Sequence, residues 1–247
     1  MGYDYIEGKK RIYDILDSKT KIQVTNNIPK QDSEFTYENG IKAWVGSIFV
    51  DIVDSSSLFK DYDAEKVARI IRAFCSEIIE ILRLNDQYVQ IGIRGDCVYA
   101  IYSVSTKEDL KQILSDAIMV NTFQKMFQKI LKTKQYTTFD IGIGLGASQD
   151  LIVKGGRKGT GISDYIWIGD AVVDASKLSS QGNRDSFEPI CLSSCFFENI
   201  SEFNANDDYK YNHYFNAKYS YKLGETVYHG DMINCAFNNW IDGGMNG

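Results

Sequence analysis

The sequence predicts an α+β fold with a ferredoxin-like βαββαβ core. The first observation behind this prediction is the order of the hydrophobic patterns between residues 43 and 146, which run as strand, helix, strand, strand, helix and strand. The second is composition, because 247 residues with 44% hydrophobic and 24% charged residues suffice for a complete globular core. A helical N-terminal arm is expected before this core, and a β extension after it.

Each element of the core has its own signal. An apolar, β-branched run predicts the first strand, apolar residues at helical spacing predict both helices, and alternation predicts the other strands. Arg94 and Gly95 interrupt the alternation and predict a hairpin turn. The expected elements are strand 43–52, helix 63–83, strands 88–93 and 96–103, helix 109–132 and strand 138–146.

The segments outside this core are less regular. Residues 1–40 are polar with a short amphipathic stretch and are predicted to form the arm, while residues 41–247 are predicted to form the functional domain. Residues 152–165 are predicted to form a basic, glycine-rich loop, and residues 165–182 a short strand, a turn and a helix. The C-terminal extension is expected to contain strands within 188–194 and 225–237.

The expected strand order brings two distant aspartates together. In a βαββαβ core the sheet runs 4-1-3-2, so the first and third strands are antiparallel neighbours. Asp51 ends the first strand and Asp96 begins the third, so their carboxylates should meet at one edge of the sheet. A single aspartate at a strand end is usually a turn or cap residue, but the pairing favours a metal site.

Net charge and hydropathy narrow the class of protein. The net charge of −6 argues against a nucleic-acid-binding protein, which is normally basic. No apolar run approaches the roughly 20 residues of a membrane helix, and the N-terminus lacks the apolar segment of a signal peptide. We therefore expect a cytoplasmic protein that binds neither nucleic acid nor membrane, with its scattered cysteines reduced.

The residues around the two aspartates suit a nucleotide and divalent cations. Mg²⁺ and Mn²⁺ prefer oxygen ligands, and Mg²⁺ is often bound by one or two carboxylates together with substrate phosphates. Ser55 and Ser56 open a helix whose backbone N–H groups could bind phosphate oxygens. Asp54 is either a third ligand or, as we favour, the cap of that helix. Lys177 could stabilise developing phosphoryl charge, although a helical lysine is usually a surface residue.

Three segments resemble, in order, the motifs of the class III nucleotide cyclases: FVDIVDSSSLF around Asp51, IGIRGDCVYA around Asp96, and DYIWIGDAVVDASKLSS around Lys177. The resemblance covers roughly residues 42–182. It implies that Asp51, the Ile52 carbonyl and Asp96 hold two Mn²⁺ or Mg²⁺ ions per site and that Lys177 acts on the transition state. It also implies a homodimer whose subunits share each active site, with the metal ligands from one subunit and the base contacts and Lys177 from the other.

Departures from the purine-specific members of this family indicate a pyrimidine substrate. Gly92 and Ile166 stand where those enzymes carry their purine-binding residues, and hydrogen-bonding groups of that kind discriminate strongly between bases. In this respect the chain is similar to the bacterial pyrimidine cyclases of the Pycsar anti-phage system, which make cyclic UMP or cyclic CMP to signal to an effector protein. The resemblance implies substrate contacts at Phe49, Asp54, Ser55, Ser56, Arg94 and Ile166.

Two further departures leave alternatives open. Val173 aligns with the transition-state asparagine of the family, and Lys177 with its arginine. A degenerate cyclase domain that binds nucleotide as a sensor without turnover is therefore the alternative function. A scaffold in which both aspartates are turn residues is the simplest alternative. The sequence does not distinguish UTP from CTP, and we prefer UTP only slightly.

Overall fold

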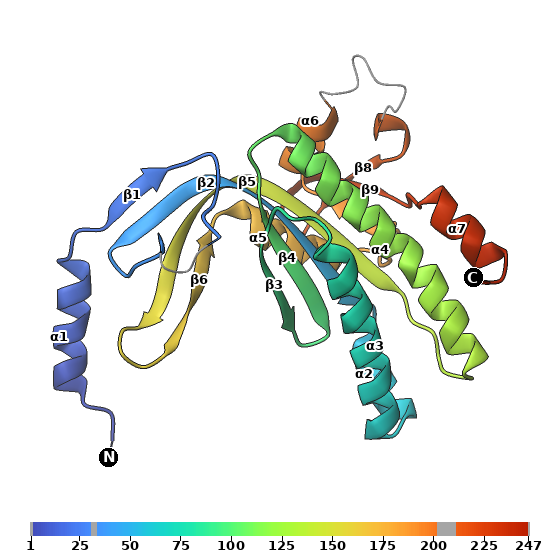
Figure 1. Cartoon of the computed structure of the whole chain (residues 1–247), viewed down its shortest axis with the longest axis horizontal. Helices are drawn as coiled ribbons and strands as arrows, with labels where there is room; N and C mark the ends of the chain where they lie inside the picture. The colour runs from blue at the N-terminus through green and yellow to red at the C-terminus, as the bar shows by residue number, and fades with distance from the viewer. Residues whose placement is uncertain (1, 31–33, 202–210, 247) are drawn as a thin grey trace.

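The fold is built around one mixed sheet, seen in a computed structural model that describes residues 2–30, 34–201 and 211–246. The strands lie in the order β3-β4-β2-β5-β7-β9-β8, with β1 beside β2 and β6 beside β5 (Figure 1). Its first part, β3-β4-β2-β5, is the predicted 4-1-3-2 order, so the predicted core topology is confirmed. These four strands are β2 (Asn39–Ile52), β3 (Tyr88–Arg94), β4 (Cys97–Ser103) and β5 (Ile141–Arg157).

Helices cover both faces of this sheet. Ile48, Val50 and Ile52 of β2 point to the face covered by α3 (Ala64–Leu82) and α4 (Lys107–Thr133), where the main hydrophobic core lies. Asp63 caps α3 by accepting the Lys66 N–H at 2.9 Å. Both predicted helices are confirmed, with ends that differ by no more than about two residues.

The opposite face carries α5 (Asp170–Ser179), which lies directly on β5. Glycines at alternate positions of β5 make this close approach possible. A Cβ on Gly142 would come within 2.0 Å of the Ser179 carbonyl oxygen, and one on Gly144 within 2.0 Å of the Ala175 carbonyl oxygen. The small residues that the sequence places on one face of this strand therefore set the distance between α5 and the sheet. This distance in turn determines the position of Lys177.

Two predicted segments differ from the structure. The glycine-rich segment 152–165 is mostly strand, because β5 continues to Arg157 and β6 (Ile162–Ile168) returns beside it. Gly159 and Gly161 have positive φ and make the turn of this hairpin. The predicted C-terminal strand stops at Gly230, and Asn234 then caps α7 (Cys235–Asp242) by accepting the Phe237 N–H.

The remaining elements are the short helix α2, the arm and the extension. The arm holds α1, which stands apart at one end of the molecule (Figure 1), and β1. In its described residues the extension contains helices as well as strands, so it is less purely β than predicted. The bounds are α1 (Tyr5–Leu16), β1 (Lys21–Val24), α2 (Ser55–Asp61), β7 (Ile190–Leu192), α6 (Ser194–Ser201), the 3₁₀ turn η3 (Tyr211–His213), β8 (Asn216–Ser220) and β9 (Glu225–Gly230).

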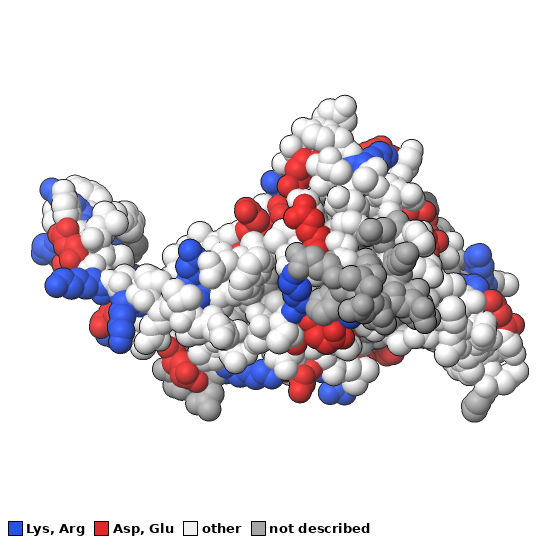
Figure 2. Space-filling model, turned by 90° about the horizontal axis from the view of Figure 1, so that it is seen from above, with Lys and Arg blue, Asp and Glu red and all other residues white. Residues whose placement is uncertain are grey.

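The surface of the described residues carries mixed charge. On the face shown in Figure 2, Lys and Arg are interspersed with Asp and Glu, and they do not form the extended basic surface that nucleic-acid binding requires. None of the helices in the described ranges combines the length and hydropathy that a membrane span needs.

Candidate active site

The side chains of Phe49 and Asp51, two predicted site residues of β2, project from the face that carries α5. Because side chains alternate along a strand, Ser47, Phe49 and Asp51 point away from the core formed with α3 and α4. The Ser47 hydroxyl donates to the Ala171 carbonyl of α5 at 2.6 Å, which fixes this orientation. On β4, Tyr99 lies on the same face. The strand register thus presents one row of side chains from β2 and β4 toward α5.

Two adjoining pockets, which we call the groove, occupy this face. The first has a volume of about 350 Å³ and the second of about 380 Å³, and both are lined by Phe49 and Arg94. The first pocket also contains Asp51 and Lys177, so a single chain brings these two predicted catalytic residues to one space, whereas the resemblance implied that Lys177 would come from the other subunit. Its lining is completed by Cys97, Ser176, Ser179 and Ser180.

Asp51 and Asp96 meet at one edge of the sheet, as the strand order predicts. Burial raises the pKa of the Asp51 carboxyl above its ordinary value, and the nearby Asp96 carboxylate raises it further. Both carboxylates also act on Cys97, whose pKa rises to about 12, chiefly through burial. The structure therefore brings the two predicted metal ligands together, in a place where negative charge is concentrated.

Arg184, which the sequence analysis missed, contacts the Asp51 carboxylate. Arg184 Nη2 donates to Asp51 Oδ2 at 3.1 Å and to the Ile52 carbonyl oxygen at 3.0 Å. Its Nη1 donates to the Ser179 and Gly182 carbonyl oxygens at 3.3 Å each. The guanidinium partly offsets the upward shift of the Asp51 pKa, and the Lys222 ammonium acts in the same direction.

These residues fit a divalent cation, although they are few. Asp51, the Ile52 carbonyl and Asp96 offer oxygen ligands of the kind that Mg²⁺ and Mn²⁺ prefer. The position already accommodates positive charge, since the Arg184 guanidinium contacts both the Asp51 carboxylate and the Ile52 carbonyl. In the described part of the chain no group of three or more His, Cys, Asp or Glu side chains is arranged to hold a metal. Any ion here would therefore take its remaining ligands from substrate or water.

The second pocket is aromatic, with a polar rim that the sequence analysis also missed. The Phe49 and Tyr99 rings stack with centroids 5.1 Å apart. Gln90 joins β3 to β6, because its Oε1 accepts the Trp167 indole N–H at 2.9 Å and its Nε2 donates to Asp164 at 3.4 Å. An aromatic wall beside amide, carboxylate and guanidinium groups suits a small polar ring such as a nucleobase.

The other predicted substrate residues are not among those that line the groove. Ile166 sits on the opposite face of β6 from its neighbours Tyr165 and Trp167 and is 47% exposed, so this chain does not bring it to the groove. Ser55 and Ser56 begin α2, directly after the turn that follows Asp51.

The structure contradicts the capping role that we predicted for Asp54. It occupies the N-cap position of α2, but its side chain makes no capping hydrogen bond. Its backbone is left-handed, with φ 52°, which is uncommon for a residue other than glycine. The side chain therefore does not have the capping role that we favoured, because the left-handed backbone replaces the extended conformation of an N-cap.

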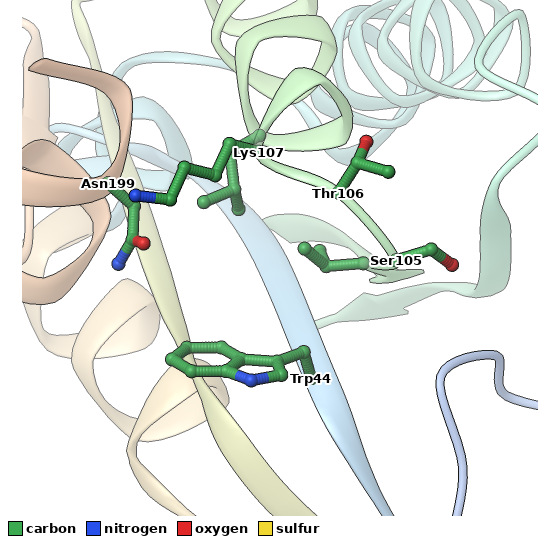
Figure 3. Close-up of a pocket in the computed structure, with 7 residues that line it drawn as sticks. Trp44, Ser105, Thr106, Lys107 and Asn199 are labelled. Carbon is green, nitrogen blue, oxygen red and sulfur yellow. The ribbon is translucent and has the colours of Figure 1, made fainter. Parts of the chain in front are cut away.

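A further pocket lies at the opposite end of β2 from Asp51. It has a volume of about 260 Å³ and lies between Trp44, the start of α4 and Asn199 of α6 (Figure 3). Lys107 extends across it toward Asn199 (Figure 3). No predicted site residue lines this pocket.

The fold and the paired aspartates define the class of protein, a nucleotide cyclase catalytic domain. The family described as the adenylate and guanylate cyclase catalytic domain matches residues 39–205, and the chain belongs to this family, the class III nucleotide cyclases. It is 40% identical to a uridylate cyclase from Treponema porcinum, over 99% of this chain and 83% of the relative. It is 28% identical to a uridylate cyclase from Gulbenkiania mobilis, over 98% of this chain and 96% of the relative.

Solved structures agree on the fold. An adenylyl cyclase from P. aeruginosa aligns with a TM-score of 0.64 at 17% identity, over 79% of this chain and 97% of that one. A guanylyl cyclase aligns with a TM-score of 0.63 at 12% identity, over 81% of this chain and 97% of that one. At such identities the likeness concerns the fold alone.

Proposed function

We propose that this chain is a uridylate cyclase that converts UTP to cyclic UMP and pyrophosphate. The observation that carries the choice of substrate is the 40% identity to a uridylate cyclase over 99% of this chain. Asp51 and Lys177 line one pocket and the Asp96 carboxylate acts on Asp51, which supports phosphoryl-transfer chemistry. CTP is the competing substrate, since it differs from UTP only in the group at position 4 of the base.

In the proposed reaction, the ribose 3′-oxygen attacks the α-phosphorus, a new O–P bond closes the ring, and the bond to pyrophosphate breaks. The hydroxyl proton leaves to solvent or to a phosphate oxygen. Asp51, the Ile52 carbonyl and Asp96 would hold two divalent ions, which supply charge neutralisation and a lowered hydroxyl pKa when bound. Lys177, in the last turn of α5, contributes positive charge to the same pocket.

Base recognition is assigned to the aromatic pocket. The stacked Phe49 and Tyr99 rings offer an apolar wall for the base, and Arg94 lines both this pocket and the pocket that contains Asp51. Ser55 and Ser56 remain predicted phosphate contacts, and Asp54 a predicted substrate contact. Neither the aromatic wall nor Arg94 requires a purine.

We propose that the enzyme works as a homodimer with shared active sites. Apolar side chains of β6 and α5 are exposed in the single chain: Ile166 by 47%, Ile168 by 51% and Val173 by 44%. A second copy would cover them, and Ile166 would reach the base from that copy. Ile166 and Ile168 lie on the same face of β6, because they are two positions apart on the strand, and an apolar face of this kind suits an interface.

The physiological setting is proposed from the sequence resemblance to the pyrimidine cyclases of the Pycsar system. By that resemblance the enzyme is assigned to the cytoplasm and to anti-phage defence, with a downstream effector that binds the cyclic nucleotide.

The deciding experiment is a product profile. The purified chain is incubated with Mn²⁺ and each labelled nucleoside triphosphate in turn, and cyclic products are separated by chromatography. We expect cyclic UMP, abolished in Asp51→Ala and retained in Asp86→Ala, which removes an exposed carboxylate outside the groove. Conversion of ATP or GTP instead of the pyrimidine nucleotides would refute the substrate, and full turnover by Asp51→Ala would refute the metal role.

One observation favours the alternative of a nucleotide sensor. Val173 stands where the family has a catalytic asparagine, so the site lacks one polar group expected to act on the transition state. Tight UTP binding by a verified dimer, with no cyclic product from any of the four nucleotides, would support the sensor.

A further inference from the structure

Arg184 makes four hydrogen bonds that tie two predicted catalytic elements together. One nitrogen of its guanidinium contacts the Asp51 carboxylate and the Ile52 carbonyl, at 3.1 and 3.0 Å. The other contacts the Ser179 and Gly182 carbonyls, each at 3.3 Å. The Arg184 and Asp51 side chains are only 23% and 22% exposed, so this ion pair is more strongly held than an open surface pair.

The two oxygens held by Nη2 are the same two oxygens that are assigned to a divalent cation. A cation bound to both would lie beside the guanidinium, and the two positive charges would repel each other. Arg184 is also well suited to hold the oxygens in the absence of an ion, because a planar guanidinium donates to several acceptors at once.

We propose that Arg184 is an internal stand-in for the first divalent cation, and that binding of Mn²⁺ or Mg²⁺ to Asp51 and the Ile52 carbonyl displaces it. This inference rests on the proposed function, because it takes those two oxygens as ligands. In the ion-free enzyme the guanidinium neutralises Asp51 and keeps the ligands in place. On ion binding, the arginine gives up both acceptors.

The displacement has a consequence for α5. Ser179 is the last residue of that helix and Gly182 lies in the turn after it, so Arg184 connects the ligand Asp51 to the end of the helix that carries Lys177. When Arg184 leaves Asp51, this connection breaks. Cation binding is therefore coupled to the freedom of the Lys177 segment.

The test measures Mn²⁺ binding to the full chain without nucleotide, by the electron paramagnetic resonance signal of free Mn²⁺. Removing the competitor in Arg184→Ala should tighten Mn²⁺ binding on the order of tenfold, the effect of losing a charge-assisted hydrogen-bonded pair. Arg184→Lys keeps the charge but not the planar guanidinium that donates to several acceptors. Its Mn²⁺ affinity should lie between those of the wild type and Arg184→Ala. Arg83→Ala, which removes an exposed arginine paired with Glu80, should bind Mn²⁺ as the wild type does.

The outcomes separate this inference from the proposed function. If Asp51→Asn binds Mn²⁺ as tightly as the wild type, the assigned metal site itself is wrong. If wild-type binding depends on Asp51 but Arg184→Ala binds equally or more weakly, the stand-in role is overturned and the metal site is kept. Should Arg184→Ala fail to fold, Arg184→Lys decides alone: tighter binding than wild type supports the displacement, and equal or weaker binding overturns it.

Discussion

Two buried carboxylates of this molecule, Asp51 and Asp116, show how different surroundings give the same group different uses. Asp51 faces the groove and has cationic neighbours, Arg184 and Lys222, that oppose the effect of burial on its pKa. Asp116 lies on α4 and is only 6% exposed. It accepts neutral hydrogen bonds, from Asn85 Nδ2 at 2.9 Å and Gln112 Nε2 at 3.3 Å.

The difference appears in their ionisation. Burial raises the pKa of Asp116 to about 6, and the amide donors only partly oppose it, so this carboxyl gains a proton easily. Asp51 is held beside full positive charges and beside a second carboxylate, Asp96. An acid with amide partners fixes local structure, whereas an acid with exchangeable cationic partners is prepared to bind ions.

The largest effect should come from removing the second carboxylate beside Asp51. Asp96→Asn is expected to lower the rate of cyclic UMP formation by about a thousandfold, equivalent to about 4 kcal/mol, because a metal ligand supplies several kcal/mol of charge stabilisation. Asp116→Asn should retain activity within about threefold, since Asp116 lies in the core away from the groove. Initial rates with UTP and Mn²⁺ measure both, and equal losses in the two variants would remove the distinction drawn here.

The second prediction concerns stability and pH. The folded Asp116 has a pKa of about 6 and the unfolded residue about 3.9. The folded state therefore binds more protons between these values, so this group's contribution to the unfolding free energy falls as pH rises from about 4 to about 6 and is constant above that. Relative to Asp116→Asn, the wild type should lose up to about 3 kcal/mol between pH 4 and pH 7.

Urea denaturation at pH 4, 5, 6 and 7 on both proteins measures this difference. The other titrating groups are common to both chains and cancel in the comparison. Parallel profiles for the wild type and Asp116→Asn would mean that Asp116 has the same pKa in the folded and the unfolded protein, and would contradict the prediction.

Sequence patterns predicted the approach of Asp96 to Asp51 but not the contact of Arg184 with Asp51. The approach of Asp51 to Asp96 follows from strand order, and strand order follows from hydrophobic periodicity, so local signals were sufficient. The contact of Arg184 with Asp51 depends instead on how the chain turns after α5. The local sequence there, with Gly182 and a left-handed Asn183, indicates only that a helix ends.

The sequence predicted Phe49 and Arg94 of the aromatic pocket but missed Gln90 and Trp167, for a related reason. Gln90 and Trp167 meet because β6 folds back along β5, as in the pairing of Ile152 with Trp167. The glycines of segment 152–165 suggested a loop, and a loop gives no register from which to predict partners. Tertiary pairing overrode the weak strand propensity of those glycines.

The smallest effect should appear at Asp54, in the turn that follows Asp51. Its left-handed backbone contrasts with the regular helix around Asp116, and its side chain makes no capping hydrogen bond. Asp54→Ala should lower the unfolding free energy by about 1 kcal/mol relative to Asp54→Gly, because glycine adopts this conformation without a steric cost. The two variants lack the same carboxylate, so their difference in urea denaturation reports the backbone alone. Activity then reports the side chain: if the Asp54 carboxylate contacts substrate, Asp54→Gly should raise the KM for UTP while remaining as stable as the wild type, and an unchanged KM would leave Asp54 as a turn residue only.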